Sequence, residues 1–423
     1  MPELDTHALL MIAVFIIGYV FITIEHVVRI DKATTALLTG IICWIIQYAR
    51  GTSACGDEIY CLEVHMAAIS QIVFFLLGAL AIVELMSIHK GFAVISDLLT
   101  IRSKRKLMWL ISIIAFLLSG ILDNLTTTIV MVTLLSKIVN SGQDRLILGG
   151  AVVIAANAGG AWTPIGDVTT TMLWIDGQIS TIAVMRDLFL PSLVCMIVSI
   201  SCLSLFVSGE FQKKSEVDKD QKLEPFAKIV FFLGIGVLVF VPIFKIWTGL
   251  PPFMGVLFGL CILWLVTDIA HGKFEDRQHL RVPEIFSKIN FSSLLFFLGI
   301  LLAISALDAA QVLTALASWF NQNVGNTTVI ATMIGLASAV VDNVPLVAAS
   351  MGMYTLEQYP QDHSFWQLIA YCAGTGGSIL IIGSAAGVVF MGLEKVDFFW
   401  YLKRISLPAL LGYFAGIAVY LLV

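Results

Sequence analysis

Charged residues are scarce in this sequence. Asp, Glu, Lys and Arg make up 13% of the 423 residues, whereas hydrophobic residues make up 59%. So little charge cannot cover a soluble particle of this size, which excludes a soluble globular protein. No basic face exists outside short loops, which excludes a nucleic-acid-binding protein. Apolar runs of about 17 to 25 residues, the length that crosses a bilayer, recur instead. Because the strands of a β-barrel would be shorter and alternating, we expect an all-α polytopic membrane protein.

The N-terminal segment lacks the Lys or Arg residues with which a signal peptide begins. We therefore expect the first apolar run to be retained. Cysteines are also few, and five of the seven stand singly in apolar runs, a pattern typical of packing residues: Cys43, Cys195, Cys202, Cys261 and Cys372. Cys55 and Cys61 share a polar loop, so they form either a disulfide in an oxidising compartment or two free thiols.

Lys and Arg are absent from residues 309–364 and unevenly distributed elsewhere. Cytoplasmic loops of membrane proteins carry an excess of these residues. One set of loops holds 21 of the 24, and this set comprises residues 26–32, 89–106, 137–145, 209–228, 271–290 and 395–404. Assigning this set to the cytoplasm predicts ten spanning helices, two helical hairpins that return to the side they came from, and both termini outside.

The hairpins are predicted at 107–138 and 328–358, where long apolar stretches are interrupted by Asp123-Asn124 and Asp342-Asn343. Such an interruption is tolerated in a membrane only where protein or water satisfies the broken backbone. The ten predicted spans, two of them broken by glycines, lie near 8–25, 33–49, 66–88, 146–176 (broken), 187–208, 229–246, 253–270, 291–308, 365–394 (broken) and 404–423.

Three patterns recur at separations of 221, 219 and 217 residues, beginning at Phe74 and Leu295, Ser119 and Ser338, and Ala158 and Thr375. Chance likeness of apolar helices is the alternative, but three ordered matches favour two inverted repeats, the sign of a secondary transporter. Each repeat then holds one hairpin and one broken helix. The predicted organisation is N-terminal helices over 1–65, repeat 1 over 66–208, a cytoplasmic linker over 209–228, helices and a loop over 229–290, and repeat 2 over 291–423.

Asp123, Asp167 and Asp342 lie in apolar sequence beside predicted helix breaks. A buried carboxylate is unfavourable unless it is paired, protonated or bound to a cation. Apart from Lys137 at the cytoplasmic end of the first, neither hairpin contains Lys or Arg, so we expect an exchangeable cation as the partner. A cap or turn at the break could explain one of these residues, but three favour a functional role.

Sodium prefers oxygen ligands, and Asn157, Thr169 and Thr170 add neutral oxygens beside the glycine-broken backbone near Asp167. Sodium is therefore predicted at the three aspartates. Because a protonated carboxylate is a poor ligand, proton and metal compete for the same site, which is the chemistry of an antiporter. The three carboxylates should titrate as a coupled set.

Four further residues are weaker candidates for the ion site, because each also fits a structural role. Ser378 and Ser384 lie in the second broken helix, where Ser384 takes the place of Asp167, but small residues also serve close helix packing. Glu84 fits an interfacial position beside the cytoplasm. His65 fits a pH sensor or a residue that faces the outer loop.

These motifs resemble the sodium/proton antiporters of the NhaD type, within a superfamily that includes arsenite permeases and dicarboxylate carriers. The likeness spans the chain and rests on the segments 119–128 (which includes Thr126), 157–170, 340–345 and 374–378. It implies exchange of sodium or lithium for protons without a cofactor, higher activity at alkaline pH, and a homodimer with a scaffold and a moving domain in a bacterial inner membrane. It places function on Asp123, Asn124, Asn157, Asp167, Thr169, Thr170, Ser338, Asp342 and Asn343.

Other functions remain open. A sodium-coupled carrier of a dicarboxylate or arsenite would share the fold, although neutral hairpin tips would serve an anion better than aspartates. An intramembrane aspartic protease would use paired aspartates but leaves the repeat unexplained. A passive channel would more often line a symmetric pore. We therefore expect a transporter and not an enzyme.

Overall fold

The computed structural model describes residues 5–23, 25–51, 58–96, 101, 103–140, 142–210 and 224–423. Regular structure in these residues is helical, apart from one isolated bridge between Ser103 and Glu210. The all-α prediction is thus confirmed. Cys55 and most of the predicted linker over 209–228 lie outside the described residues, so the disulfide to Cys61 stays a prediction.

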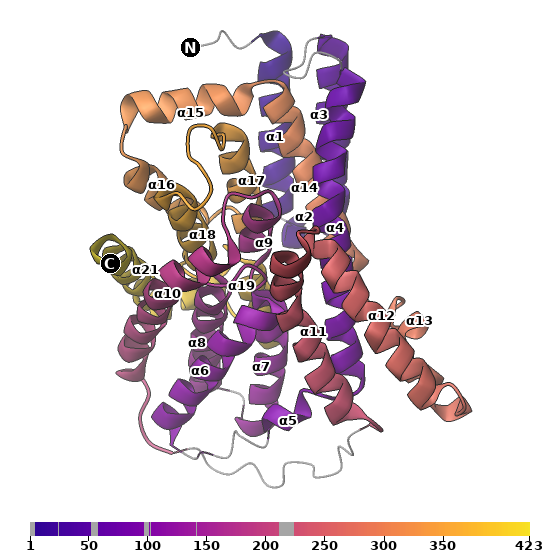
Figure 1. Ribbon diagram of the computed structural model, residues 1–423. Coiled ribbons are helices and arrows are strands. Elements are labelled where there is room, and N and C mark those ends of the chain that lie inside the picture. Colours follow the sequence, from indigo (N-terminus) through magenta and orange to yellow (C-terminus); the bar gives the residue numbers. More distant parts are fainter. Residues whose placement is uncertain are drawn as a thin grey trace.

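Figure 1 shows the helices as a bundle, with α15 lying across one end beside the N-terminal helices. The first five helices are α1 (Thr6–Thr23), α2 (Glu25–Val28), α3 (Lys32–Arg50), α4 (Glu58–Ile88) and α5 (Ala93–Ser96). The next five are α6 (Lys104–Leu122), α7 (Asn124–Ile138), α8 (Gln143–Gly160), α9 (Val168–Ile175) and α10 (Thr181–Ser204).

The second half begins with α11 (Ala227–Thr248), α12 (Pro252–His271), the 3-10 helix η1 (Glu275–Leu280), α13 (Val282–Ile285), α14 (Phe291–Ala309) and α15 (Val312–Asn323). It ends with α16 (Thr327–Ala337), α17 (Asn343–Met353), α18 (Ser364–Gly376), α19 (Ala385–Glu394), α20 (Phe398–Arg404) and α21 (Ser406–Leu422). Helix α15 was not predicted, because its 12 residues are too short for a span and carry no hairpin signal.

Six helices of the described chain are long and apolar enough to cross a membrane, or seven if the bent pair α20 and α21 counts as one span. These six are α4, α6, α10, α11, α12 and α14. The predicted ten differ in two ways. They include α1, α3, α21 and the two broken helices, whose pieces fall short in length or hydropathy when each is taken alone, and they leave out α6, which was predicted as half of a hairpin although it is long and apolar enough to span. The chain is nevertheless a multi-pass membrane protein.

The two ends of each interrupted stretch lie close together. Lys104, which begins α6, forms an ion pair of 2.6 Å with Asp144, which follows α7. Tyr354, just after α17, donates a hydrogen bond of 3.2 Å to Asn321, which precedes α16. The Asp-Asn break of each pair therefore lies away from both of its ends, and Asn124 and Asn343 are buried. Figure 1 shows α6 and α7 side by side within the bundle.

Glycines allow the two broken helices to fold back on themselves. A Cβ atom at Gly160 would meet the carbonyl oxygen of Gly166 at 2.5 Å, and one at Gly377 would meet that of Gly383 at 2.8 Å. No larger residue fits either position without a shift of the backbone. The chain can therefore stop α8 and α18 inside the protein and restart as α9 and α19.

Candidate ion-binding site

The first helix break is at Asp123, which ends α6 and begins α7. Its backbone has φ 95° and ψ 160°, a conformation that residues with a side chain rarely adopt. The carboxylate accepts a hydrogen bond of 2.7 Å from the backbone N–H of Thr126 and one of 3.0 Å from its hydroxyl. Thr126 therefore fixes this carboxylate at the start of α7.

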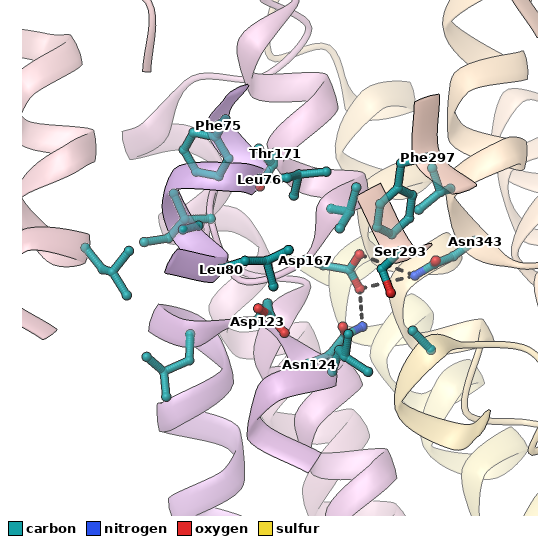
Figure 2. A pocket seen from close by; sticks show the side chains of 18 of the residues that line it. Phe75, Leu76, Leu80, Asp123, Asn124, Asp167, Thr171, Ser293, Phe297 and Asn343 are labelled. Carbon is teal, nitrogen blue, oxygen red and sulfur yellow. Dashed lines mark hydrogen bonds between the residues drawn. The ribbon is translucent and has the colours of Figure 1, made fainter. Parts of the chain in front are cut away.

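Asp167 lies at the centre of the polar contacts. It begins α9, is 2% exposed, and accepts hydrogen bonds from the backbone N–H (2.9 Å) and hydroxyl (3.0 Å) of Thr169. The side-chain amide of Asn124 donates to it at 2.6 Å, and that of Asn343 donates at 3.2 and 3.3 Å. Figure 2 shows the two amides converging on this carboxylate. Both hairpins are thus tied to the first broken helix.

The second break, at Asp342, is held differently. Its backbone N–H donates to the hydroxyl of Tyr19 on α1 at 2.8 Å, and the backbone N–H groups of Asn343 and Val344 face its carboxylate. Lys32, the first residue of α3, lies close enough for its charge to act on Asp342. The ammonium of Lys32 itself lies over the ring of Phe296, 4.7 Å from the ring centre.

A cavity of about 60 Å³ joins the three aspartates. Since one water needs about 10 to 15 Å³, the cavity holds a few waters or a small ion. No Lys or Arg is among the residues that line this cavity. The lining residues come from the two breaks, from α4, α9, α11, α14 and α19, and from the loop before α9. They include Asp342 and the residues labelled in Figure 2, which are Phe75, Leu76, Leu80, Asp123, Asn124, Asp167, Thr171, Ser293, Phe297 and Asn343.

Asn157 links the two broken helices beneath the cavity. Its amide oxygen accepts from Asn124 at 3.1 Å, and its amide nitrogen donates to the hydroxyls of Ser378 and Ser384 at 2.9 Å each. These three residues are buried. Ser378 and Ser384 therefore contact the site through Asn157, and neither lines the cavity.

Other predicted residues lie outside the lining of the described cavity. Ser338 donates its hydroxyl to the carbonyl of Ala373 at 2.8 Å, and Thr170 donates to the carbonyl of Asp167 at 2.9 Å. His65 packs against the ring of Trp44 at 6.0 Å, and Glu84 is half-buried on α4. The hydroxyls of Ser338 and Thr170 therefore hydrogen-bond to the backbone of the broken helices. His65 and Glu84 do not line the cavity.

Sequence reasoning missed Tyr19, Lys32 and Ser293. The sequence predicted Lys32 in a cytoplasmic loop. It predicted Tyr19 and Ser293 within uninterrupted spans, over 8–25 and 291–308. A lysine directly at the start of a predicted span was the available signal, since the first turn of a helix can reach below the membrane surface.

The described residues contain no group of three or more His, Cys, Asp or Glu side chains that could hold a metal ion. The three aspartates therefore do not form a closed carboxylate cage. Any cation in this cavity would need additional ligands, and the amides of Asn124 and Asn343, the backbone carbonyls and water are the oxygen sources at hand.

Membrane helices that break around buried carboxylates define this chain as a membrane transporter. The family model described as Citrate transporter matches residues 8–366, and the chain belongs to this family. The assignment to a transporter family also means that the chain is not classed as an enzyme.

Several relatives match almost the whole chain. "Sodium/proton antiporter 1" of Arabidopsis thaliana is 52% identical over 98% of this chain and 72% of its own length. "Sodium/proton antiporter 2" of the same plant is 49% identical over 98% and 99%. "Na(+)/H(+) antiporter NhaD" of Vibrio cholerae is 30% identical over 97% and 90%. The resemblance to the NhaD type is confirmed.

Proposed function

We propose that this protein exchanges sodium for protons across a membrane by alternating access. The observation that carries the proposal is the convergence of Asp123, Asp167 and Asp342 on one small cavity without a Lys or Arg in its lining. The relatives named sodium/proton antiporters support it. Lithium, which resembles sodium in its ligand preference, is a further substrate to test.

The chemistry of the proposal follows from competition at the carboxylates. An ionised aspartate in this cavity is unfavourable without a cation, and a protonated one is a poor ligand. Sodium entry therefore favours proton release, and protonation favours sodium release. The amides of Asn124 and Asn343 donate to Asp167 and so stabilise its charged form while sodium is exchanged.

We propose Asp123, Asp167 and Asp342 as the sodium-binding carboxylates, with Asn124 and Asn343 as the amides that hold Asp167. The proposed positioning residues, which hold these side chains by hydrogen bonds, are Asn157, Thr126 and Thr169. Thr170, Ser338, Ser378 and Ser384 support the broken backbone, and His65 and Glu84 have the weakest claim because they lie outside the cavity lining.

The test is proton movement in proteoliposomes that contain the purified protein and an internal pH dye. External sodium should raise the internal pH, potassium should not, and Asp123→Asn should remove the response. Asp276→Asn, which changes an exposed aspartate of η1, is the matched control and should behave as wild type.

A second candidate function is sodium-coupled uptake of an organic anion, which the description of the family model favours. The same vesicles decide between the two. Uptake of labelled succinate or citrate, with no proton response to sodium or lithium, would replace the antiporter by an anion carrier.

Location and assembly belong to the same proposal. The bacterial relatives support a bacterial inner membrane, but the plant relatives at higher identity also fit an organellar or other membrane. We further propose a homodimer and two inverted repeats with both termini outside. Chemical cross-linking in membranes tests the first, and cysteine accessibility at residues 5 and 423 tests the termini.

A further inference from the structure

Three consecutive threonines lie at the start of α9, and their hydroxyls differ in their partners. Thr169 donates its hydroxyl to the carboxylate of Asp167 at 3.0 Å, and Thr170 donates to the backbone carbonyl of the same residue at 2.9 Å. The side chain of Thr171 makes no hydrogen bond within the part of the chain that the structure describes. One hydroxyl of the three is therefore left for a partner other than the protein.

Thr171 is buried at the wall of the ion cavity. It is 1% exposed, and it lines the cavity together with the three aspartates. Among the lining residues, Ser293 also has a hydroxyl that makes no hydrogen bond with a described residue, but its side chain is only half-buried. A fully buried hydroxyl without a partner is unfavourable, because the contacts that it made with water are not replaced. Thr171 therefore requires a partner inside the cavity.

Thr171 lies one helical turn after Asp167. Its backbone N–H donates to the carbonyl of Asp167 at 3.0 Å, which closes this turn. Residues four apart lie on one face of a helix, with their Cβ atoms about 5 to 6 Å apart, and helical side chains lean toward the N-terminus. In Figure 2, Thr171 lies above Asp167 and Asn124 lies below it. The side chain of Thr171 therefore leans toward the end of α9 that carries Asp167.

A hydroxyl oxygen is a suitable ligand for a small hard cation. Such an ion takes several oxygen ligands, each at about 2.4 Å, so one ion bridges two oxygens about 5 Å apart. A hydroxyl group has one hydrogen and two lone pairs, and it rotates to suit its partner. The same group therefore can donate to a water and, when an ion replaces that water, present a lone pair to the ion.

We propose that Thr171 is a further sodium ligand, whose hydroxyl oxygen completes the coordination of the ion at the aspartates. This role rests on the proposed sodium/proton exchange. The hydroxyl neither gains nor loses a proton at neutral pH, so it binds the ion without taking up the transported proton. Thr171 should therefore raise the affinity for sodium and leave proton binding to the carboxylates.

The experiment compares Thr171→Val and Thr171→Ser with wild type in the proteoliposome assay at one fixed pH. Valine has the shape of threonine without the hydroxyl, so the apparent KM for sodium should rise about fivefold, as expected for the loss of one neutral polar contact. Serine keeps the hydroxyl and should keep KM within about twofold of wild type.

Thr267→Val is the matched control. Thr267 is also buried, but it lies on α12, which does not line the cavity, and it donates its hydroxyl to the carbonyl of Trp264 at 3.0 Å. The KM for sodium should not change in this variant. Thermal unfolding in detergent separates a ligand from a packing residue, because an ion that binds the folded state stabilises it. Sodium should therefore raise the Tm of wild type and Thr171→Ser more than that of Thr171→Val.

An unchanged KM in Thr171→Val, with wild type active, would overturn the role of Thr171 and leave the proposed exchange standing. Absence of sodium-driven proton movement in wild type would remove the proposed function itself. If the valine variant does not fold, Thr171→Ala also lacks the hydroxyl and serves the same comparison.

Discussion

The two helix breaks that form the cavity have the same residues but different surroundings. At the first, Asp123 has a backbone with positive φ (95°), and its carboxylate is held by Thr126 at the start of α7. At the second, Asp342 is held from outside, by Tyr19 of α1, with Lys32 of α3 close by. Equal motifs thus give one break that is internally fixed and one that depends on the neighbouring helices.

The two broken helices differ in charge while sharing geometry. Asp167 has φ −144° and ψ 150°, and Ser384 has φ −148° and ψ 155°, and both begin a helix by accepting a backbone hydrogen bond. A carboxylate caps the start of α9, and a hydroxyl caps the start of α19. Both side-chain amides of the hairpins are aimed at the carboxylate. The two broken helices therefore share their backbone geometry, but the charged group lies only in the first, at Asp167.

The largest expected effect comes from removing the polar group at the start of α9, compared with the same removal at the start of α19. Asp167→Asn removes the carboxylate that accepts from Asn124 and Asn343, so it loses charged hydrogen bonds worth about 2 to 3 kcal/mol, or about 30- to 150-fold in apparent sodium affinity. Ser384→Ala should change the affinity by less than about threefold, since its hydroxyl meets only Asn157 and a backbone N–H. Sodium-driven proton movement measures both, and equal losses would contradict the asymmetry.

The next effect separates the two amides. Asn124→Ala removes the shorter bond to Asp167, at 2.6 Å, together with the bond to Asn157, whereas Asn343→Ala removes only longer bonds of 3.2 and 3.3 Å. We expect the KM for sodium to rise about tenfold in the first and about threefold in the second. A titration of sodium at fixed pH measures both variants. A larger effect of Asn343→Ala would show that the second hairpin controls Asp167.

A smaller effect tests whether the serines of the two hairpins act alike. Ser119 donates to the carbonyl of Ala156 at 2.6 Å, and Ser338 donates to that of Ala373 at 2.8 Å. Each alanine variant should lose about 1 kcal/mol of stability. The KM for sodium should not change. Thermal unfolding in detergent and the vesicle assay measure the two quantities. A raised KM in Ser338→Ala alone would restore Ser338 as an ion ligand.

Much of this site was predictable, because apolar runs with polar interruptions mark where a membrane helix stops. The sequence indicated the breaks at Asp123 and Asp342, the glycines before Asp167, and the carboxylates themselves. It did not indicate which side chains meet. The hydrogen bond between Tyr19 and the backbone of Asp342 joins positions 323 residues apart, and no local pattern encodes such packing. Ser338 fitted an oxygen ligand by type, but its hydroxyl is directed to a helix carbonyl.

The smallest expected effect on transport concerns the imidazoles outside the site, and it sharpens the assignment of pH dependence to the aspartates. His89, directly after α4, is buried, its Nδ1 donates to the carbonyl of Leu85, and its Nε2 lies 3.2 Å from that of His271. Burial lowers the pKa of His89 to about 4. It is therefore neutral throughout the range from pH 6.5 to 9, and His89→Gln should leave the pH profile of exchange unchanged there.

The same histidine should instead affect stability in acid. Because its pKa in the folded protein lies below the unfolded value of about 6.5, the unfolded chain binds more protons, and stability falls as the pH drops below 6.5 toward 4. The loss amounts to about 2 kcal/mol at pH 5. Thermal unfolding of wild type at pH 7.5 and 5 should show this loss, and His89→Gln should reduce it. If the variant instead shifts the pH profile of exchange, the imidazoles take part in the proton response and the aspartates do not account for it alone.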